Sequence, residues 1–136
     1  MLDEIAIADC ALQLDGADLD DLFSTAVQAL AAVMVDPETL PVTVERTLTL
    51  TAPSLDLLLY DWLSEMIYVK DAEQIVFTRA AVHVDEAPPR LRARLGGGRL
   101  DPPRTALRAD AKAVTLHGFA LEQRDGGWRA RVVIDI

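Results

Sequence analysis

The printed sequence ends in two residues that offer adjacent anionic groups. The side-chain carboxylate of Asp135 stands next to the α-carboxylate of Ile136. Hard cations such as Ca²⁺, Mg²⁺ and Mn²⁺ prefer oxygen ligands of this kind. On composition alone, such an aspartate is more often a solvated carboxylate at the end of a strand. A metal site therefore does not follow from these two residues alone.

The other reactive residue types exclude several kinds of site. The single cysteine, Cys10, has no partner for an internal disulfide, and its apolar surroundings predict a small buried side chain rather than a nucleophile. The only two histidines, His83 and His117, are far apart in sequence, so no zinc spacing is present. Residues 96–98 are glycines without the GxxxxGKS or GxxxxGKT pattern of a phosphate-binding loop. No Ser, Cys or His dyad points to covalent catalysis.

Charge is unevenly distributed along the chain, whose net charge is −9. Residues 1–89 hold 3 basic and 17 acidic side chains, whereas residues 90–136 hold 10 basic and 5 acidic ones. Arginines that alternate along strands usually form the solvated face of a sheet, and we favour this interpretation. Direct RNA binding is the alternative, although the negative net charge opposes unspecific attraction to phosphate. It would involve Arg90, Arg92, Arg94, Arg129 and Arg131.

Length and composition predict one domain, residues 1–136, because 136 residues with 51% hydrophobic content suffice for a single core. The N-terminal segment Met1–Glu4 has neither the basic nor the apolar region of a signal peptide, and charges interrupt every long apolar stretch. We therefore expect a cytoplasmic protein that does not enter a membrane. The sequence leaves the oligomeric state open.

Two amphipathic helices are expected in the first half of the chain. Asp18 is a good N-cap, and apolar residues then recur at helical spacing from Leu19 to Met34, before Pro37 ends the helix. Ser54 similarly caps a second helix, whose apolar stripe runs from Leu55 to Ile67.

Two-residue alternation and β-forming residues predict six strands. Arg46 interrupts the apolar face of the second strand, and Asp125-Gly126-Gly127 predicts a hairpin between the last two. Residues 96–98 and 101–103, rich in Gly and Pro, are the best candidates for a mobile loop. The predicted fold class is α+β, with two helices packed on a largely antiparallel sheet in the order β-α-β-α-β-β-β-β. The strands are expected at residues 5–14, 42–50, 75–85, 90–95, 112–123 and 128–135.

Segments along nearly the whole chain resemble the archease family, in the family's order. The segment from Leu19 to Asp36 resembles its first helix, and Trp62-Leu63-Ser64-Glu65-Met66-Ile67-Tyr68 resembles its WLNELLY helix. Lys112-Ala113-Val114-Thr115-Leu116-His117 resembles its K-A-V-T-Y-H strand, and Val132-Val133-Ile134-Asp135-Ile136 its terminal V-x-x-D-I. The resemblance implies a strand-helix-strand-strand protein that is a chaperone-like accessory factor, not an enzyme, of an RtcB-type RNA ligase. It would promote guanylylation and repeated turnover of the ligase in tRNA splicing and RNA repair, and would meet RNA indirectly.

The resemblance also implies roles for individual residues. The family's acidic metal pocket combines an aspartate of the first strand with one near the C-terminus, and the matching positions are Asp9 and Asp135. If the first strand pairs near the last, these carboxylates and that of Ile136 would converge on Ca²⁺, Mg²⁺ or Mn²⁺. Lys112 matches the motif lysine and would contact a phosphate or the ligase, unless it is an ordinary surface lysine. His117 is a further candidate ligand, although a single histidine on a strand is more often structural.

The sequence departs from the family at two places. The usual H-T-A-D becomes Ala6-Ile7-Ala8-Asp9, so weaker metal binding is expected if the missing His and Thr orient the aspartate. Arg99 stands near the place of an acidic residue that follows the glycine-rich segment. Two alternatives to the accessory role remain. One is a degenerate family member that serves as an interaction scaffold, and the other is a metal-dependent hydrolase built on the same candidate residues.

Overall fold

The computed structural model describes residues 9–136, and it confirms the predicted α+β class and element order. Residues 5–8, part of the first predicted strand, lie outside the described residues. No helix of residues 9–136 is long and apolar enough to cross a membrane. In chain order, the elements are β1 (Asp9–Gly16), α1 (Leu19–Met34), the 3-10 helix η2 (Pro37–Thr39), β2 (Val44–Thr51), α2 (Leu55–Glu73), β3 (Ile75–Glu86), β4 (Pro89–Arg99), β5 (Ala113–Arg124) and β6 (Gly127–Asp135).

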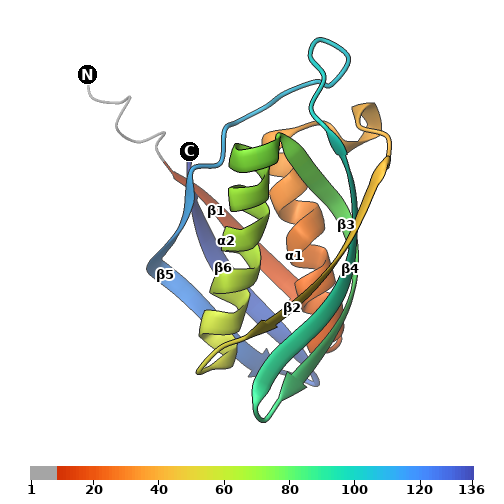
Figure 1. Cartoon of the computed structure of the whole chain (residues 1–136). Coiled ribbons are helices and arrows are strands. Elements are labelled where there is room, and N and C mark those ends of the chain that lie inside the picture. The colour runs from red at the N-terminus through yellow and green to blue at the C-terminus, as the bar shows by residue number, and fades with distance from the viewer. Residues whose placement is uncertain (1–8) are drawn as a thin grey trace, which may run out of the picture.

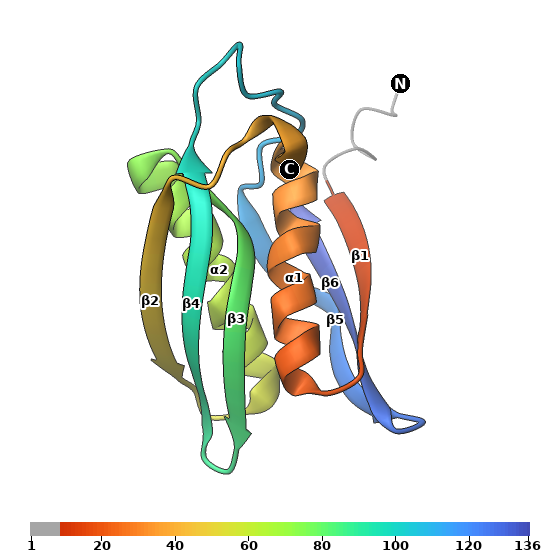
Figure 2. The same cartoon turned by 90° about the vertical axis from the view of Figure 1, so that its right-hand side faces the viewer.

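The six strands form two antiparallel sheets, ordered β1-β6-β5 and β2-β4-β3. The helices lie between the sheets, and both α1 and α2 contact strands of each (Figure 1, Figure 2). The predicted packing of two helices on antiparallel strands is confirmed, with the strands divided between two sheets. Each sheet therefore has an inner face toward the helices and an outward face.

Both helices begin at the predicted caps. The Asp18 carboxylate and the Ser54 hydroxyl each accept a hydrogen bond from the N–H three residues later, at 2.8 Å and 3.2 Å. The apolar stripes are buried, as their spacing predicts. α2 continues beyond the end of its predicted stripe and stops at Gln74, whose φ of 59° lies in the left-handed region.

Arg46, which interrupts the inner face of β2, is accommodated by an ion pair. Its guanidinium nitrogens lie 2.6 Å from both carboxylate oxygens of Glu73, the last residue of α2. The hydrogen bonds from Arg46 lower the pKa of Glu73 below its ordinary value. Because both side chains remain partly exposed, β2 carries this charge without burying an unpaired group.

The core fills the space between the two sheets with side chains from both helices and from the inner faces of the strands. Trp62 of α2 is its largest fully buried side chain. The Trp62 Nε1–H donates a hydrogen bond of 3.0 Å to the Phe23 carbonyl of α1, which satisfies the polar atom of the indole. Within residues 9–136, no buried side-chain nitrogen or oxygen lacks a partner.

Residues 96–98 belong to β4, so the prediction of a mobile loop at these glycines is wrong. β3 is irregular between Phe77 and Arg79, opposite the glycines, and the two backbones approach closely there. A Cβ atom on Gly97 would lie 2.1 Å from the Val76 carbonyl oxygen. Close packing of the strands therefore requires glycine here. Residues 101–103, by contrast, lie in the connection from β4 to β5.

Candidate functional site

The pairing of β1 with β6 brings Asp9 and Asp135 together. Asp9 stands directly opposite Asp135 in this antiparallel pair. Opposite residues point to the same face, with Cβ atoms about 4.5–5.5 Å apart. This is the outward face, because the adjacent residues Cys10 and Ile134 belong to the core side. Asp9 is exposed and Asp135 is half-buried, and neither carboxylate has a hydrogen-bond or ion-pair partner within residues 9–136.

Lys112 and Ile136 border the aspartate pair, whereas His117 does not join it. The Lys112 N–H donates a hydrogen bond of 2.7 Å to the Asp135 carbonyl, but its side chain is exposed and has no ion-pair partner in the described chain. Ile136 follows Asp135 directly and packs its side chain against the core. His117 is exposed and lies in the stretch of β5 that loses register with β6. Its N–H donates to the Thr115 hydroxyl at 2.9 Å.

The oxygen donors suit a hard divalent cation but form only part of a coordination shell. Two carboxylates on one face supply ligands that Ca²⁺, Mg²⁺ and Mn²⁺ prefer. Across residues 9–136, no group of three or more His, Cys, Asp or Glu side chains is arranged to hold a metal ion. Because Ca²⁺ takes about 6–8 oxygen ligands, further ligands would have to come from outside this pair of aspartates.

Lys70, which the sequence pattern did not single out, fixes the segment that leads into this site. The side chain of Lys70 is 6% exposed, and its Nζ donates to the Ala111 carbonyl at 2.8 Å. Nζ also contacts the carboxylates of Asp71, at 2.6 Å, and Asp110. These contacts hold the residues directly before Lys112 and β5. Lys70 extends the buried stripe of α2 by one turn, which is the signal that could have identified it.

Lys70 gives a pH-dependent contribution to stability. Burial alone would lower the pKa of Lys70, but hydrogen bonds to Asp110 and Asp71 outweigh burial and raise this pKa above its ordinary value of 10.5. Since the pKa is higher in the folded than in the unfolded state, the stabilisation is fully present below pH 10.5. It is lost as the pH rises through the folded-state value.

Lys70→Met is expected to lower the free energy of unfolding by about 1–3 kcal/mol at neutral pH, because hydrogen bonds to charged and buried partners disappear. The difference in the free energy of unfolding between this variant and wild type should shrink above pH 10.5, the ordinary pKa of a lysine. Urea unfolding at the two pH values measures both effects. Lys112→Met is the matched control, since it changes an exposed lysine and should cost less than about 0.5 kcal/mol. Equal losses in the two variants would contradict the role of Lys70.

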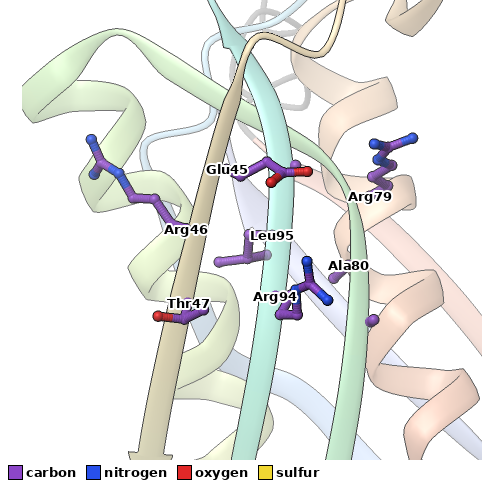
Figure 3. A pocket seen from close by; sticks show the side chains of 9 residues that line it. Glu45, Arg46, Thr47, Arg79, Ala80, Arg94 and Leu95 are labelled. Carbon is purple, nitrogen blue, oxygen red and sulfur yellow. The ribbon is translucent and has the colours of Figure 1, made fainter.

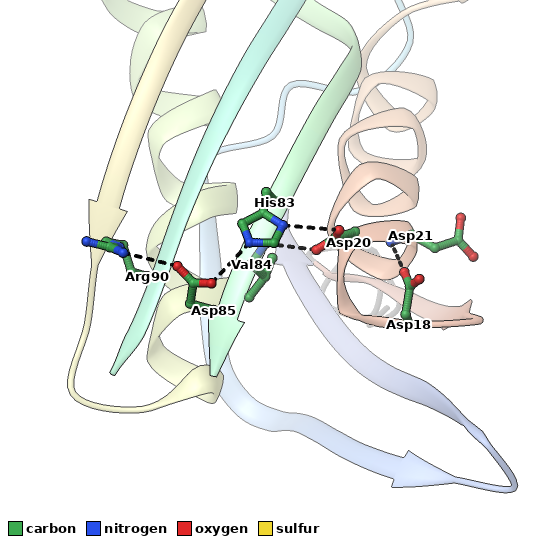
Figure 4. Close-up of polar contacts among 7 residues, drawn as sticks. All are labelled: Asp18, Asp20, Asp21, His83, Val84, Asp85 and Arg90. Atoms are coloured by element: carbon green, nitrogen blue, oxygen red, sulfur yellow. Dashed lines mark hydrogen bonds and ion pairs between the residues drawn. The ribbon is translucent and has the colours of Figure 1, made fainter. Parts of the chain in front are cut away.

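His83 belongs to a separate polar cluster on the other sheet (Figure 4). Its ring lies 3.0 Å from Asp85 and 3.6 Å from Asp20, and Arg90 lies 3.2 Å from Asp85. Hydrogen bonds from Arg90 and then His83 lower the pKa of Asp85 below its ordinary value. Asp20 also accepts a hydrogen bond of 2.8 Å from the Val84 N–H, which ties the first turn of α1 to β3. We assign this cluster a structural role, because its groups satisfy one another.

The candidate RNA-binding arginines are divided between the two sheets. Arg90, Arg92 and Arg94 lie on β4, whereas Arg129 and Arg131 lie on β6. Arg129 pairs with an aspartate of β1 at 2.7 Å, and Arg131 donates to a backbone carbonyl of β5 at 3.2 Å. The two β6 arginines are therefore engaged by their own sheet.

The structure also places Cys10 and Arg99, two residues of interest in the sequence. Cys10 is half-buried and packs against the core, as a small apolar side chain would. Arg99, which stands near the place where an acidic residue is expected from the resemblance, is the exposed last residue of β4. Residues 6 and 7, which match the His and Thr of the H-T-A-D pattern, lie outside the described residues.

The chain matches known proteins over nearly its whole length. Residues 2–136 match the family model described as Archease protein family. Two relatives named Protein archease, from Methanosarcina mazei and Methanothermobacter thermautotrophicus, are each 33% identical over 132 residues. These matches cover 95% of this chain and 90% and 93% of the respective relatives.

Two solved structures share the fold. The solution structure of Methanobacterium thermoautotrophicum protein 1598 has a TM-score of 0.82 and 32% identity, with 95% of this chain and 93% of that chain covered. A crystal structure from Thermotoga maritima, described as an archease and possible chaperone, has a TM-score of 0.68, 17% identity and coverage of 95% and 91%. At this lower identity, the second match supports the fold alone.

Proposed function

Because the chain belongs to the archease family, we propose that it is a cytoplasmic accessory protein that activates an RtcB-type RNA ligase and is not itself an enzyme. In this role it would promote guanylylation and repeated turnover of the ligase during tRNA splicing and RNA repair. The observation that carries the proposal is the Asp9–Asp135 pair, which this chain retains on adjacent strands.

We also propose that Asp9 and Asp135 hold a divalent cation, Ca²⁺, Mg²⁺ or Mn²⁺, together with the α-carboxylate of Ile136. The two carboxylates share an outward face and have no cationic partner in the described chain, which leaves their oxygens available to a cation. When bound, the cation would supply positive charge for a phosphate or a carboxylate of the ligase. A backbone hydrogen bond joins Lys112 to Asp135, so the Lys112 side chain would contact the same partner group.

The surroundings of the hydroxyl and imidazole groups favour an accessory role over catalysis. The Ser24 hydroxyl donates to the Ala80 carbonyl at 2.9 Å, the Ser54 hydroxyl caps α2, and the His83 ring contacts carboxylates. In residues 9–136, no serine or cysteine is hydrogen-bonded to a histidine that could activate it. A hydrolase would therefore have to rely on the aspartate pair alone.

The test of this proposal is multiple-turnover RNA ligation by the RtcB-type ligase of the same organism, with and without this protein. Wild type is expected to increase the number of turnovers. Asp135→Asn keeps the side-chain shape but removes a ligand charge, so it should lose at least about tenfold of the stimulation. Asp125→Asn is the matched control, because it makes the same change at an exposed residue of the β5–β6 turn and should stimulate like wild type.

Calorimetric metal titration of the same variants, and of Asp9→Asn, distinguishes a failure of metal binding from a failure of ligase activation. Wild type and Asp125→Asn should bind a divalent cation, and Asp9→Asn and Asp135→Asn should bind it at least about tenfold more weakly. Stimulation that Asp135→Asn fully retains would refute the role of the aspartate pair. Wild-type protein that neither binds metal nor stimulates the ligase would favour the alternative of an interaction scaffold with the archease fold, which is motivated by Ala6 in place of a histidine.

A further inference from the structure

The outward face of the β2-β4-β3 sheet carries a row of arginines. Along β4, exposed and buried residues alternate between positions 90 and 95, and the exposed ones are Arg90, Arg92 and Arg94. They share one face and follow one another at about 7 Å, the rise of two residues in a strand. Arg79 of β3 stands opposite Gly96, the next position on this face of β4. We call Arg79, Arg92 and Arg94 the arginine face.

Small or hydroxyl-bearing side chains surround most of the arginine face. Arg92 and Arg94 are exposed, and open hollows run along the three strands beside them. Figure 3 shows one of these hollows, with Arg79 and Arg94 among its lining residues. The positions that flank Arg92 and Arg94 across the sheet are Thr47, Thr49, Ala81 and His83. A ligand that lies along the sheet can therefore reach the guanidinium groups.

The arginine face lacks the carboxylate partners that other arginines have. Its three side chains make no ion pair and no side-chain hydrogen bond with any of residues 9–136. Arg46 and Arg129, by contrast, reach carboxylates at 2.6 Å and 2.7 Å. Glu45, which stands opposite Gly96, shares this face but is not bonded to it. Although the chain has 22 acidic residues, these positive charges are left for an anion from outside.

We propose that the arginine face binds the sugar-phosphate backbone of single-stranded RNA. Guanidinium groups match phosphate oxygens with two parallel hydrogen bonds, and the hydroxyls of Thr47 and Thr49 can donate to the same groups. The regular spacing of Arg92 and Arg94 suits a ligand whose charges also repeat regularly. The residues on the face include no Phe, Tyr or Trp, so bases are not stacked and binding does not depend on sequence.

An acidic protein segment fits this face less well than RNA does. Protein interfaces depend on aromatic or aliphatic anchors buried at their centre. Only one exposed large hydrophobic residue of the described chain, Val42, adjoins the arginine face, through contact with the position of Gly96. The complete set is Val42, Leu57, Tyr68, Leu107 and Leu116. Charge without apolar anchors is characteristic of phosphate-backbone binding.

The arginine face and the Asp9–Asp135 pair lie on opposite sides of the protein. Each occupies the outward face of its own sheet, and the helices separate the two sheets (Figure 2). One side can therefore meet the ligase while the other holds the RNA. RNA binding goes beyond the proposed activation of a ligase, and it can be measured on this protein alone.

The test is fluorescence anisotropy of labelled oligouridylate and oligoadenylate titrated with the full chain. Both RNAs should bind with similar dissociation constants of about 1–100 µM at physiological salt. The logarithm of the association constant, plotted against the logarithm of the salt concentration, should have a slope of about −2 for three neutralised phosphates. In the Arg92→Gln/Arg94→Gln variant, binding should weaken at least about tenfold. The slope should become shallower by about 1.4, or about 0.7 for each arginine removed.

The matched control is Arg129→Gln/Arg131→Gln, which removes the same charge at the same spacing from β6 of the other sheet. Circular dichroism verifies that both variants fold, and the control should bind RNA like wild type. An equal loss in both variants, or a loss confined to the control, would overturn the proposal. Tighter binding of oligoglutamate than of RNA, lost in the Arg92/Arg94 variant, would overturn it in favour of an acidic protein partner. Absence of salt-dependent RNA binding by wild type would overturn it as well.

Discussion

Replacement of Trp62 by alanine is expected to lower the free energy of unfolding by about 3–5 kcal/mol. The indole is fully buried between the two sheets, so its loss leaves a cavity and removes the hydrogen bond to the Phe23 carbonyl. A chain of 136 residues has a total stability of about 7–20 kcal/mol, of which this loss is a large share. Chemical denaturation followed by circular dichroism measures it without relying on tryptophan fluorescence.

Two further substitutions separate the causes of this effect. Trp62→Phe keeps an aromatic ring but loses the Nε1–H donor, and it should cost about 1–2 kcal/mol. Trp128→Ala changes the only other tryptophan, which is half-buried near the start of β6, and should cost less than Trp62→Ala. A loss in Trp128→Ala as large as that in Trp62→Ala would contradict the central position of Trp62.

Gly97→Ala is expected to destabilise the protein by about 3 kcal/mol. The new Cβ atom would lie 2.1 Å from the Val76 carbonyl oxygen and 2.7 Å from the Phe77 Cα atom. Both are backbone atoms, so no side-chain rotation relieves the overlap. β3 and β4 must separate at their irregular point instead, and urea denaturation should report the resulting loss.

The control for Gly97→Ala is Gly126→Ala. Gly126 has a φ of +80°, and nothing lies within 4 Å of a Cβ atom added there. Gly126→Ala should lower the free energy of unfolding by about 1–2 kcal/mol, because alanine is strained in the left-handed conformation. The crowded Gly97 should therefore be more sensitive than Gly126, although only Gly126 has a conformation that favours glycine. The reverse order would show that β3 and β4 can move apart easily.

The local elements could be predicted because each has a short-range cause. Asp18 and Ser54 mark the helix starts through hydrogen bonds that span three residues. Alternation of apolar residues marks the strands, and it tells which side chains face the core. It does not tell which strands are neighbours. The division into two sheets depends on pairing between distant segments, such as β1 with β6, and no local pattern encodes it.

The candidate site could be predicted only in part. Asp9 and Asp135 were identified by family resemblance, and the β1–β6 register now accounts for their proximity. Metal binding and the ligase partner remain predictions. Lys70 was overlooked because its partners Asp110 and Ala111 lie 40 and 41 residues further along the chain. The glycines of β4 were mistaken for a loop because composition alone does not reveal how closely another backbone approaches.

β6 is the last strand of the described chain and also the middle strand of its sheet. During synthesis, β2, β3 and β4 can pair as soon as β4 has emerged, since these strands lie close together along the chain. β1 is synthesised first, but it cannot pair with its neighbour until β6 has been made. Until then, one side of the helices stays uncovered. A nascent chain halted before Gly127 would lack the strand that joins β1 to β5, which leaves apolar helix surface open to aggregation.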